Sequence, residues 1–346
     1  RNVADFVRKA QMMNYEGHRA MYEGRLGQMF KPVQGILLWM SVAAQPSFVW
    51  QIFHHDLEPN ASFFAIKKAC EQVHIQFNER HGGILQVVNH LTSAIDGAKG
   101  KAVFYNIEGT VAGTKEYDVD AKACSVTDLG AVEWPAIMSD IHFIKLELRG
   151  KDGKLLSDNF YWRSKKKEPA DMSVLEGMPV VKLSAKADYN VKDGKVIMNV
   201  TLHNPSKNIA LMAHLQLHQA KSNKRVLPVY YSDNYISLAS KETKTITIEA
   251  AEKDLDGELP RVFIDGWNIK VGKSKYIAQN ENTDISRWGD AGFTFIAPKL
   301  VAQKEVRVNC GGYNRGGFKK DPGFLEGAVG YYIEDVDTTR VQNPAP

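Results

Sequence analysis

The sequence predicts a multidomain chain that is α/β near its N-terminus and all-β over most of its remaining length. Its 346 residues exceed what one hydrophobic core usually holds, so two or three domains are expected. Up to Gln76, apolar residues recur at steps of three and four around one short apolar run, which is typical of α/β units. From Phe77 onward the period changes to two, the spacing of strands with one buried face.

The composition is that of an ordinary globular protein. Hydrophobic residues make up 44% of the sequence and charged residues 24%, and a net charge of +4 does not indicate a nucleic-acid partner. The basic run at 165–167 is interpreted as a solvated linker. No apolar stretch reaches the roughly 18 residues that a membrane span needs, so none is expected. The 3 cysteines lie far apart and form neither a disulfide framework nor a metal-ligand spacing, so they do not indicate a compartment.

The first predicted element is a helix from Val3 to about Arg25. Its apolar residues form one stripe, which we expect to pack against a sheet. The stripe comprises Val3, Phe6, Val7, Ala10, Met13, Gly17, Ala20, Met21 and Gly24. Glu16 and Glu23 lie on the other side, where solvated or salt-bridged carboxylates are the usual finding. Because the chain opens directly on this helix without a start methionine, we expect it to be a fragment of a longer protein.

A strand, a long loop and a second helix are predicted for residues 35–71. Residues 35–40 form an apolar run short enough for a buried strand, and a polar loop follows at 41–46. The amphipathic run after Glu58 predicts a helix with Pro59 near its first position. Strand, loop and helix make one unit of a parallel α/β fold, in which the loop after the strand carries the chemistry.

Two immunoglobulin-like β-sandwiches are predicted after this unit, over residues 77–164 and 168–272, because short alternating strands recur at regular spacing. A charged, proline-closed linker separates the two sandwiches. Asp152-Gly153 and Asp193-Gly194 predict tight hairpin turns, since glycine tolerates positive φ. Residues 273–346 are expected to form a C-terminal extension.

A resemblance to a known family rests on ordered, mostly rare residue types between residues 38 and 76. These are Leu38-Trp39-Met40, Pro46-Ser47, Trp50-Gln51, Leu57-Glu58-Pro59, Lys67-Lys68-Ala69-Cys70-Glu71 and Val73-His74-Ile75-Gln76. The stretch resembles the last β/α unit of family-two glycoside hydrolases, in the exo-β-D-glucosaminidase and β-mannosidase-like branch. Residues 226–235 and 265–268 are similar to the last sandwich of that branch. The resemblance implies that residues 1–76 are the C-terminal part of a (β/α)8 TIM barrel.

The resemblance also implies that no catalytic residue lies in this chain. A retaining glycosidase uses two carboxylates about 5 Å apart, one as acid/base and one as nucleophile. In the family they lie on the fourth and seventh barrel strands, which would precede Arg1. Asp56 and Glu58 follow the predicted eighth strand at too great a distance and are interpreted as loop and helix-cap residues. The expected partner is therefore the missing barrel portion of the same protein, or a companion chain.

One wall of a sugar pocket is what the resemblance assigns to this chain. Trp39 would end the eighth strand and stack on a pyranose ring, and Met40, joined to it by a cis peptide bond, would also belong to the substrate-binding site. Ser41 and Gln45 would hydrogen-bond sugar hydroxyls, and Trp50 would add a second aromatic contact. Residues 42–45 depart from the asparagines and tryptophan that the family pattern has there, so a glucosaminide, a mannoside and a galactoside all stay open as substrates.

The other candidate sites are interpreted as structural. His54, His55 and Asp56 could suggest a metal site, but adjacent histidines on one element point apart, so no metal and no cofactor is expected. The polar aromatic cluster at 230–235 either rims the pocket or forms a turn. Residues 304–313 resemble the start of a malectin-like carbohydrate-binding domain, and the alternative is an extension lying on the second sandwich.

The predicted function is that of the C-terminal part of a retaining exo-β-glycosidase, acting on β-linked carbohydrate outside the cytoplasm. Two alternatives stay open. One is a non-catalytic carbohydrate-binding module of β-sandwiches, and the other is a structural subunit that joins a separate catalytic chain. The helical prefix argues against a free binding module, because a lone barrel quarter would expose its apolar stripe.

Overall fold

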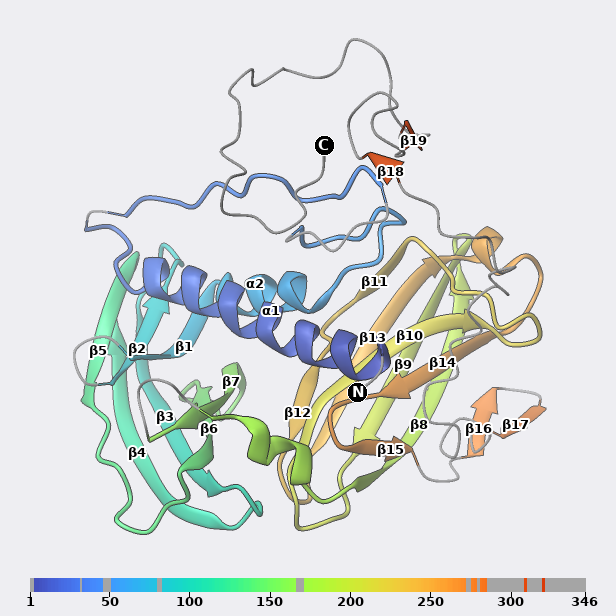
Figure 1. Cartoon of the computed structure of the whole chain (residues 1–346). Helices are drawn as coiled ribbons and strands as arrows, with labels where there is room; N and C mark the ends of the chain where they lie inside the picture. The colour runs from blue at the N-terminus through green and yellow to red at the C-terminus, as the bar shows by residue number, and fades with distance from the viewer. Residues whose placement is uncertain are drawn as a thin grey trace, which may run out of the picture. The chain divides into compact units, whose positions relative to one another are not determined.

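The computed structural model describes residues 3–31, 33–45, 51–79, 83–165 and 171–271, with short pieces at 275–278, 281–284, 308–309 and 319–320. The chain divides into one unit over Arg1–Gly292 and a second over Phe293–Pro346. The described part of the first unit holds two α-helices, α1 (Val3–Leu26) and α2 (Ala61–Ala69), and two β-sandwiches (Figure 1). The mostly β character and the immunoglobulin-like architecture predicted from the sequence are confirmed.

Helix α1 forms over nearly the range predicted, with Asp5 in its first turn and Arg25 in its last, where each charge complements the helix dipole. The buried face is not the predicted apolar stripe, however. It carries a mixture of aromatic, aliphatic and charged side chains at helical spacing: Met12, Tyr15, His18, Arg19, Tyr22, Glu23 and Leu26. Of the two alternatives predicted for Glu23, solvated or salt-bridged, the structure excludes the first, because the carboxylate is buried and lies 3.0 Å from His74 Nε2.

The apolar stripe of α1 is exposed within the described residues. Met13 is 74% exposed, and Phe6 and Met21 are each more than half exposed. A Cβ added at Gly17 or Gly24 would meet no atom within 4 Å, so neither glycine marks a close approach to another described element. The expectation that this stripe packs against a sheet is not met by any part of the chain that the structure describes.

No strand forms over residues 35–40, contrary to the prediction. The segment is irregular and Leu37 is fully exposed. A buried strand needs neighbours that accept and donate its backbone hydrogen bonds. No described strand of this chain pairs with these residues, and the first bridge beyond them joins Val42 to Phe53.

Helix α2 begins two residues later than predicted, because Asn60 is its N-cap. The Asn60 Oδ1 atom accepts hydrogen bonds from the backbone N–H groups of Ser62 (3.1 Å) and Phe63 (3.4 Å). Asparagine is among the best residues for this role. The prediction of Glu58 as a cap residue is therefore corrected. After α2, strand β1 (Val73–Asn78) starts ahead of the predicted boundary at Phe77 and pairs with β2 (Ile84–Asn89).

The first sandwich packs a sheet of order β1-β2-β5 against one of order β4-β3-β6-β7. Its further strands are β3 (Ile95–Asn106), β4 (Val111–Ala121), β5 (Ser125–Ala131), β6 (Ile141–Arg149) and β7 (Leu155–Ser164). The core between the sheets includes Ile75, Leu85, Phe104 and Leu146. Gly153 adopts φ +79° in the turn between β6 and β7, which confirms the predicted hairpin.

The second sandwich packs a sheet of order β11-β13-β9-β8-β15 against one of order β12-β10-β14. Its strands are β8 (Val181–Lys192), β9 (Lys195–His203), β10 (Ala210–Gln219), β11 (Val229–Tyr231), β12 (Ile236–Leu238), β13 (Thr243–Ala251), β14 (Pro260–Asp265) and β15 (Ile269–Val271). Asp193 and Gly194 both take positive φ between β8 and β9, as the second predicted hairpin requires. Short 3-10 helices occupy Ser173–Gly177 and Glu252–Leu255.

Little of the C-terminal extension is described. Strands β16 (Lys275–Ala278) and β17 (Glu281–Asp284) pair antiparallel in the first unit. In the second unit, β18 (Val308–Asn309) and β19 (Lys319–Lys320) pair in parallel. Apart from Val308 and Asn309, the segment 304–313 that resembles a malectin-like domain lies outside the described residues.

Both helices contact the sandwiches. At the N-terminal end of α1, Arg8 Nη1 donates to the Trp267 carbonyl at 2.8 Å, and further along the helix the Tyr15 ring lies 5.8 Å from the Trp162 ring. From α2, Lys67 Nζ donates to the Tyr231 carbonyl at 2.7 Å. Figure 1 shows α1 passing from the second sandwich at its N-terminal end toward the first sandwich at its C-terminal end. The helices therefore have fixed positions on the sandwiches, which matters for the segment between them.

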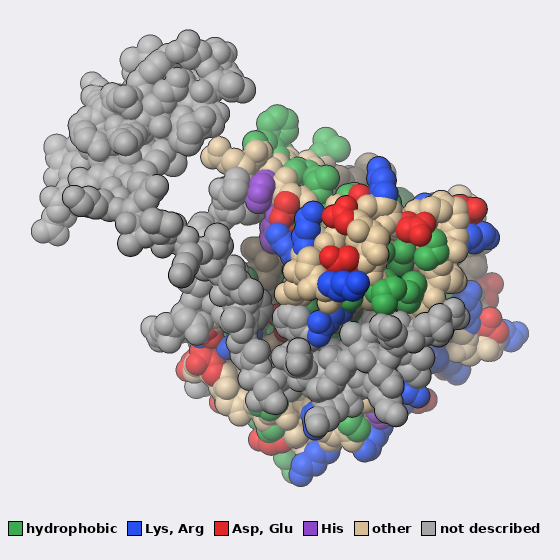
Figure 2. All heavy atoms as spheres, turned by 90° about the vertical axis from the view of Figure 1, so that its right-hand side faces the viewer, with side chains coloured by type: hydrophobic (Ala, Val, Ile, Leu, Met, Phe, Trp, Pro, Cys, Tyr) green, Lys and Arg blue, Asp and Glu red, His purple; other side chains and the backbone are tan. Residues whose placement is uncertain are grey.

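The described surface carries charges of both signs. In Figure 2, where the second sandwich faces the viewer, Lys and Arg side chains alternate with Asp and Glu side chains over the described atoms. The described part of the face in view therefore does not present the single-sign field that attracts a nucleic acid.

Candidate functional site

The peptide bond between Trp39 and Met40 is cis, as predicted. The Trp39 side chain is 80% exposed and that of Met40 is 45% exposed, so the indole is open to a partner or ligand. Ser41 and Gln45 are also exposed. The predicted contact residue Trp50 lies outside the described residues. Of the five predicted sugar-contact residues, the structure thus places four on one exposed segment.

The segment that carries Trp39 is attached to residues 51–60 by backbone hydrogen bonds. The Ser41 carbonyl accepts from the N–H groups of Ile52 (3.1 Å) and Phe53 (2.9 Å). Asn60 Nδ2 donates to the Gln51 carbonyl at 2.6 Å, and the Phe53 ring lies 4.9 Å from that of Phe63 in α2. Helix α2 therefore positions the backbone immediately after Trp39.

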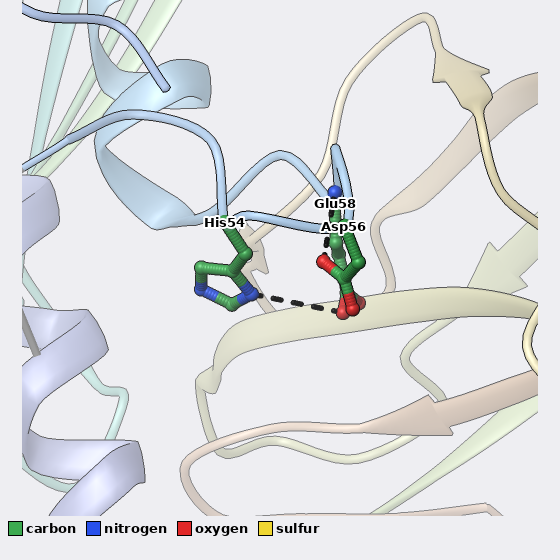
Figure 3. A group of neighbouring side chains, drawn as sticks. All are labelled: His54, Asp56 and Glu58. Carbon is green, nitrogen blue, oxygen red and sulfur yellow. Dashed lines mark hydrogen bonds and ion pairs between the residues drawn. The ribbon is translucent and has the colours of Figure 1, made fainter. Parts of the chain in front are cut away.

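His54, Asp56 and Glu58 converge at one point beside this segment. Figure 3 shows the two carboxylates side by side with the His54 ring facing them. The His54 Nδ1 atom lies 3.8 Å from Glu58 Oε2, and burial lowers the pKa of His54. Ligand atoms of these three residues lie within 4.8 Å of one another, as a metal site would require.

An arginine already occupies this carboxylate pair. Arg225 Nη2 donates to Asp56 Oδ2 at 2.6 Å, and its Nη1 atom pairs with Glu58, which also accepts from Gln216. Arginine matches two carboxylate oxygens with parallel N–H groups, and its positive charge would repel a metal ion. The cluster is therefore an ion-pair attachment between the 51–60 segment and the second sandwich.

Sequence reasoning missed this attachment. Arg225 lies 167 positions from Glu58, and nothing in the local pattern of either residue indicates the other. The partial signal was the pair of acidic residues two positions apart in a short loop, because unpaired carboxylates that close repel each other and favour a cation nearby.

The glutamates of α1 have structural partners. Glu16 pairs with Arg19 and with Arg163, whose Nη1 atom lies 2.9 Å from Glu16 Oε1. Glu23 Oε1 accepts from Asn159 Nδ2 at 2.7 Å and from the Tyr161 hydroxyl at 2.9 Å. Both carboxylates fasten α1 to strand β7.

The aromatic cluster at 230–235 packs α2 against the second sandwich. The Phe64 ring of α2 lies 6.1 Å from the Tyr231 ring and 5.9 Å from the Tyr235 ring. Asn234 Oδ1 accepts from the Leu215 N–H at 2.8 Å, which ties the turn to β10. Tyr230 is exposed, whereas Tyr231 and Asn234 are buried. The turn interpretation fits these contacts better than a pocket rim.

The sequence is similar to a glucosaminidase domain family and to known glucosaminidases and a mannosidase. Residues 159–269 match the family described as the exo-beta-D-glucosaminidase Ig-fold domain. The chain is 31% identical over 294 residues to an exo-beta-D-glucosaminidase of Streptomyces avermitilis, covering 77% of this chain and 32% of that protein. It is 24% identical over 330 residues to a mannosylglycoprotein endo-beta-mannosidase of Lilium longiflorum, covering 77% of this chain and 34% of that protein.

A solved structure of one such enzyme is also similar to this chain. The fold is similar to that of the Amycolatopsis orientalis exo-chitosanase CsxA, with a TM-score of 0.73 and 29% identity over 78% of this chain and 34% of that one. The chain thus spans about a third of the length of the curated relatives it matches. In the described part of the chain, no helix is long and apolar enough to cross a membrane.

Proposed function

From its similarity to the C-terminal portion of family-two glycoside hydrolases in the exo-β-D-glucosaminidase and β-mannosidase-like branch, we propose that this chain is part of a retaining exo-β-glycosidase. The remaining portion of that protein, or a companion chain, completes a (β/α)8 barrel and supplies both catalytic carboxylates. This chain supplies one wall of the sugar pocket and the sandwiches that brace the barrel. We place the complete enzyme outside the cytoplasm.

The observation that carries this proposal is the uncovered apolar surface of the helical region. Phe6, Met13 and Met21 on α1 and Leu37 ahead of Trp39 are exposed, while the opposite face of α1 is packed on the sandwiches. Exposed apolar groups gathered on one region mark an interaction surface. A sheet of parallel barrel strands has the apolar outer face that would cover them, and the segment 35–40 would gain its missing strand neighbours there.

In the completed enzyme, Trp39 would lie under the sugar at the scissile bond. Its indole would stack on the apolar face of a pyranose, and Met40, Ser41, Gln45 and Trp50 would contact the same sugar. The two missing carboxylates would act as acid/base and nucleophile about 5 Å apart. We propose three candidate substrates, a β-linked glucosaminide, mannoside or galactoside. More than one stays open because residues 42–45 lack the asparagines and tryptophan of the family pattern.

Mass spectrometry of the protein purified from its source tests the partnership. We expect this sequence within a longer polypeptide or in a complex with a barrel-containing chain. That species should hydrolyse at least one member of a panel of aryl β-glycosides, whereas the 346-residue chain alone should hydrolyse none. Hydrolysis by the isolated chain would overturn the assignment of the catalytic residues. An isolated chain that binds β-linked oligosaccharides and has no partner would favour the alternative, a non-catalytic binding subunit.

A further inference from the structure

His74 lies between two carboxylates that come from different elements. Its ring is fully buried in strand β1. The Nε2 atom lies 3.0 Å from Glu23 Oε1 on α1, and the Nδ1 atom lies 3.3 Å from Glu71 Oε2 in the turn between α2 and β1. Each ring nitrogen therefore faces a carboxylate oxygen at hydrogen-bonding distance.

The Glu23 carboxylate accepts hydrogen bonds from two side chains of β7. The Tyr161 hydroxyl accepts from the Phe77 N–H at 3.0 Å, so its single proton is directed at Glu23, 2.9 Å away. Asn159 Nδ2 donates to the same carboxylate at 2.7 Å. The remaining contact of Glu23 Oε1 is with His74 Nε2 at 3.0 Å, and one proton lies between these two atoms. Because an imidazole is a stronger base than a carboxylate, we assign that proton to the ring, and Glu23 is the acceptor.

The Glu71 carboxylate is also an acceptor toward its neighbours. Lys68 Nζ donates to Glu71 Oε1 at 2.8 Å. The Ser157 Oγ atom accepts from the Ile75 N–H at 3.1 Å, and its proton is therefore directed at Glu71 Oε2, at 2.7 Å. The pKa of Glu71 is lowered, because the hydrogen bonds and charges of His74 and Lys68 outweigh the effect of its burial.

A neutral imidazole has one N–H donor and one bare nitrogen, so it donates to only one of the two carboxylates. Asn159 Nδ2 lies 3.4 Å from His74 Nε2, but its two N–H groups have shorter contacts, to Glu23 Oε1 and to the Tyr161 hydroxyl, each at 2.7 Å. A bare ring nitrogen would therefore face a carboxylate oxygen with two lone pairs against each other in a buried site. We propose that His74 is a buried imidazolium that fastens α1 and the α2–β1 turn to the first sandwich, and that this fastening loosens when the ring loses a proton at alkaline pH.

Other charged groups surround His74 and its two carboxylates. The titratable and charged groups are Arg19 and Glu23 from α1, Lys68 from α2, Glu71 from the turn, Tyr161 and Asp158 from β7, and His90 after β2. The Arg19 charge is already paired with Glu16, and the Lys68 charge is shared between Glu71 and Asp158. The two carboxylates that face His74 directly therefore have the larger effect on its protonation.

The pH dependence follows from the direction of the shift. Burial lowers the pKa of His74, but the hydrogen bonds and charges of Glu23 and Glu71 raise it by more, so it lies above its usual value. A group whose pKa is raised on folding stabilises the fold fully below its unfolded pKa of about 6.5. That stabilisation is lost as the pH rises through the pKa of the folded state.

Nitrogen-15 NMR of the 346-residue chain tests the protonation directly. The chain has 10 histidines, and the resonances lost in His74→Gln identify those of His74. We expect both ring nitrogens of His74 to carry protons at about pH 7.5, where an unperturbed histidine is mostly neutral. A split pair of signals, with one protonated and one bare nitrogen, would overturn the proposal.

Thermal unfolding tests the consequence for the junction. We expect His74→Gln to lower the Tm by about 4 °C or more at about pH 6. The difference from the unsubstituted chain should shrink toward about pH 9, because that chain then loses the imidazolium. His90→Gln is the matched control, and its difference should not shrink over the same range. If His74→Gln does not fold, Glu71→Gln is the second variant. Its Tm should fall less between about pH 6 and about pH 9 than that of the unsubstituted chain, and an equal fall in both contradicts the proposal.

Discussion

The two faces of α1 are opposites in a way that hydrophobicity alone does not explain. The face on the sandwiches holds charged Arg19 and Glu23 in nearly complete burial, while the face with Phe6, Met13 and Met21 is exposed. Charged groups are buried at tolerable cost where each donor and acceptor is satisfied, and Glu23 meets that condition. Burial of a helix face therefore depends on which partner is present to contact it. We infer that the charged face has its partners in this chain and that the apolar face has its partner elsewhere.

The strongest test of the charged face is Glu23→Gln. The amide cannot accept from His74, Asn159 and Tyr161 as the carboxylate does, and it leaves His74 with one fewer negative neighbour. We expect a loss of about 3–5 kcal/mol in the free energy of unfolding, measured with denaturant. Glu116→Gln on an exposed position is the control and should change stability by less than about 0.5 kcal/mol. Equal stability of the two variants would show that Glu23 does not support the junction.

Asp158 tests whether the charged junction extends to the second sandwich. Its Oδ1 atom accepts from Lys68 at 2.9 Å and its Oδ2 atom accepts from Lys244 of β13 at 2.6 Å. Burial raises the pKa of Asp158, and Lys244 and Lys68 lower it by more, so it lies well below its usual value. Asp158→Asn should cost about 3 kcal/mol at neutral pH. Because the folded pKa is depressed, that difference should shrink as the pH falls below about 4.

The difference in the free energy of unfolding between Asp158→Asn and the unsubstituted chain is the quantity to follow. If it stays constant between neutral and acidic pH, the Asp158 charge is not what stabilises the junction. Asp118→Asn serves as the control for this titration, since its carboxylate pairs with Lys99 on the exposed surface of the first sandwich. It should alter stability by less than about 0.5 kcal/mol at either pH.

On the exposed side, Trp39→Ala should separate activity from stability. The indole is 80% exposed, so its removal leaves the free energy of unfolding of this chain within about 0.5 kcal/mol. In the completed enzyme we expect kcat/KM for an aryl β-glycoside to fall about 100-fold, or about 2.7 kcal/mol. Trp39→Phe keeps an aromatic face and should recover most of the activity lost in Trp39→Ala. If both variants hydrolyse substrate at the unsubstituted rate, Trp39 does not contact the sugar.

The mildest effect is expected from Met13→Gln combined with Met21→Gln. Glutamine is a good helix former, and both methionines are largely exposed, so the chain alone should unfold as before. Affinity for the barrel-completing portion should weaken about tenfold, as measured by calorimetry or co-purification. Ile137→Gln replaces an 85% exposed residue of the first sandwich and should leave that affinity unchanged. An equal loss of affinity in the double variant and in Ile137→Gln would mean that the apolar face of α1 is not the docking surface.

Much of the architecture could be predicted from local pattern. The bounds of α1, the change of period near Phe77 and the hairpins at Gly153 and Gly194 all depend on residues close together in sequence. The cis bond after Trp39 followed from a resemblance in residue order. The cap at Asn60 was also within reach, because asparagine two residues after Glu58 is a stronger capping signal than Pro59.

What could not be predicted depends on distant partners. The burial of Glu23 requires Asn159 and Tyr161, which lie more than a hundred positions away and are brought to α1 only by β7. The run 35–40 has the composition of a strand, but a strand exists only with neighbours to pair with. The predicted sugar-contact residues at 39–41 and 45 lie on one segment, and their role in sugar binding stays a prediction.

The arginine attachment at Asp56 and Glu58 has a consequence for engineering. A second sandwich that lacks Arg225 and Gln216 would leave two neighbouring carboxylates without a counter-charge. Their repulsion would shift the 51–60 segment, whose backbone holds Ser41 and thereby Trp39. A chimaera with a different second sandwich would therefore keep the position of Trp39 only if Gln216 and Arg225 are carried along.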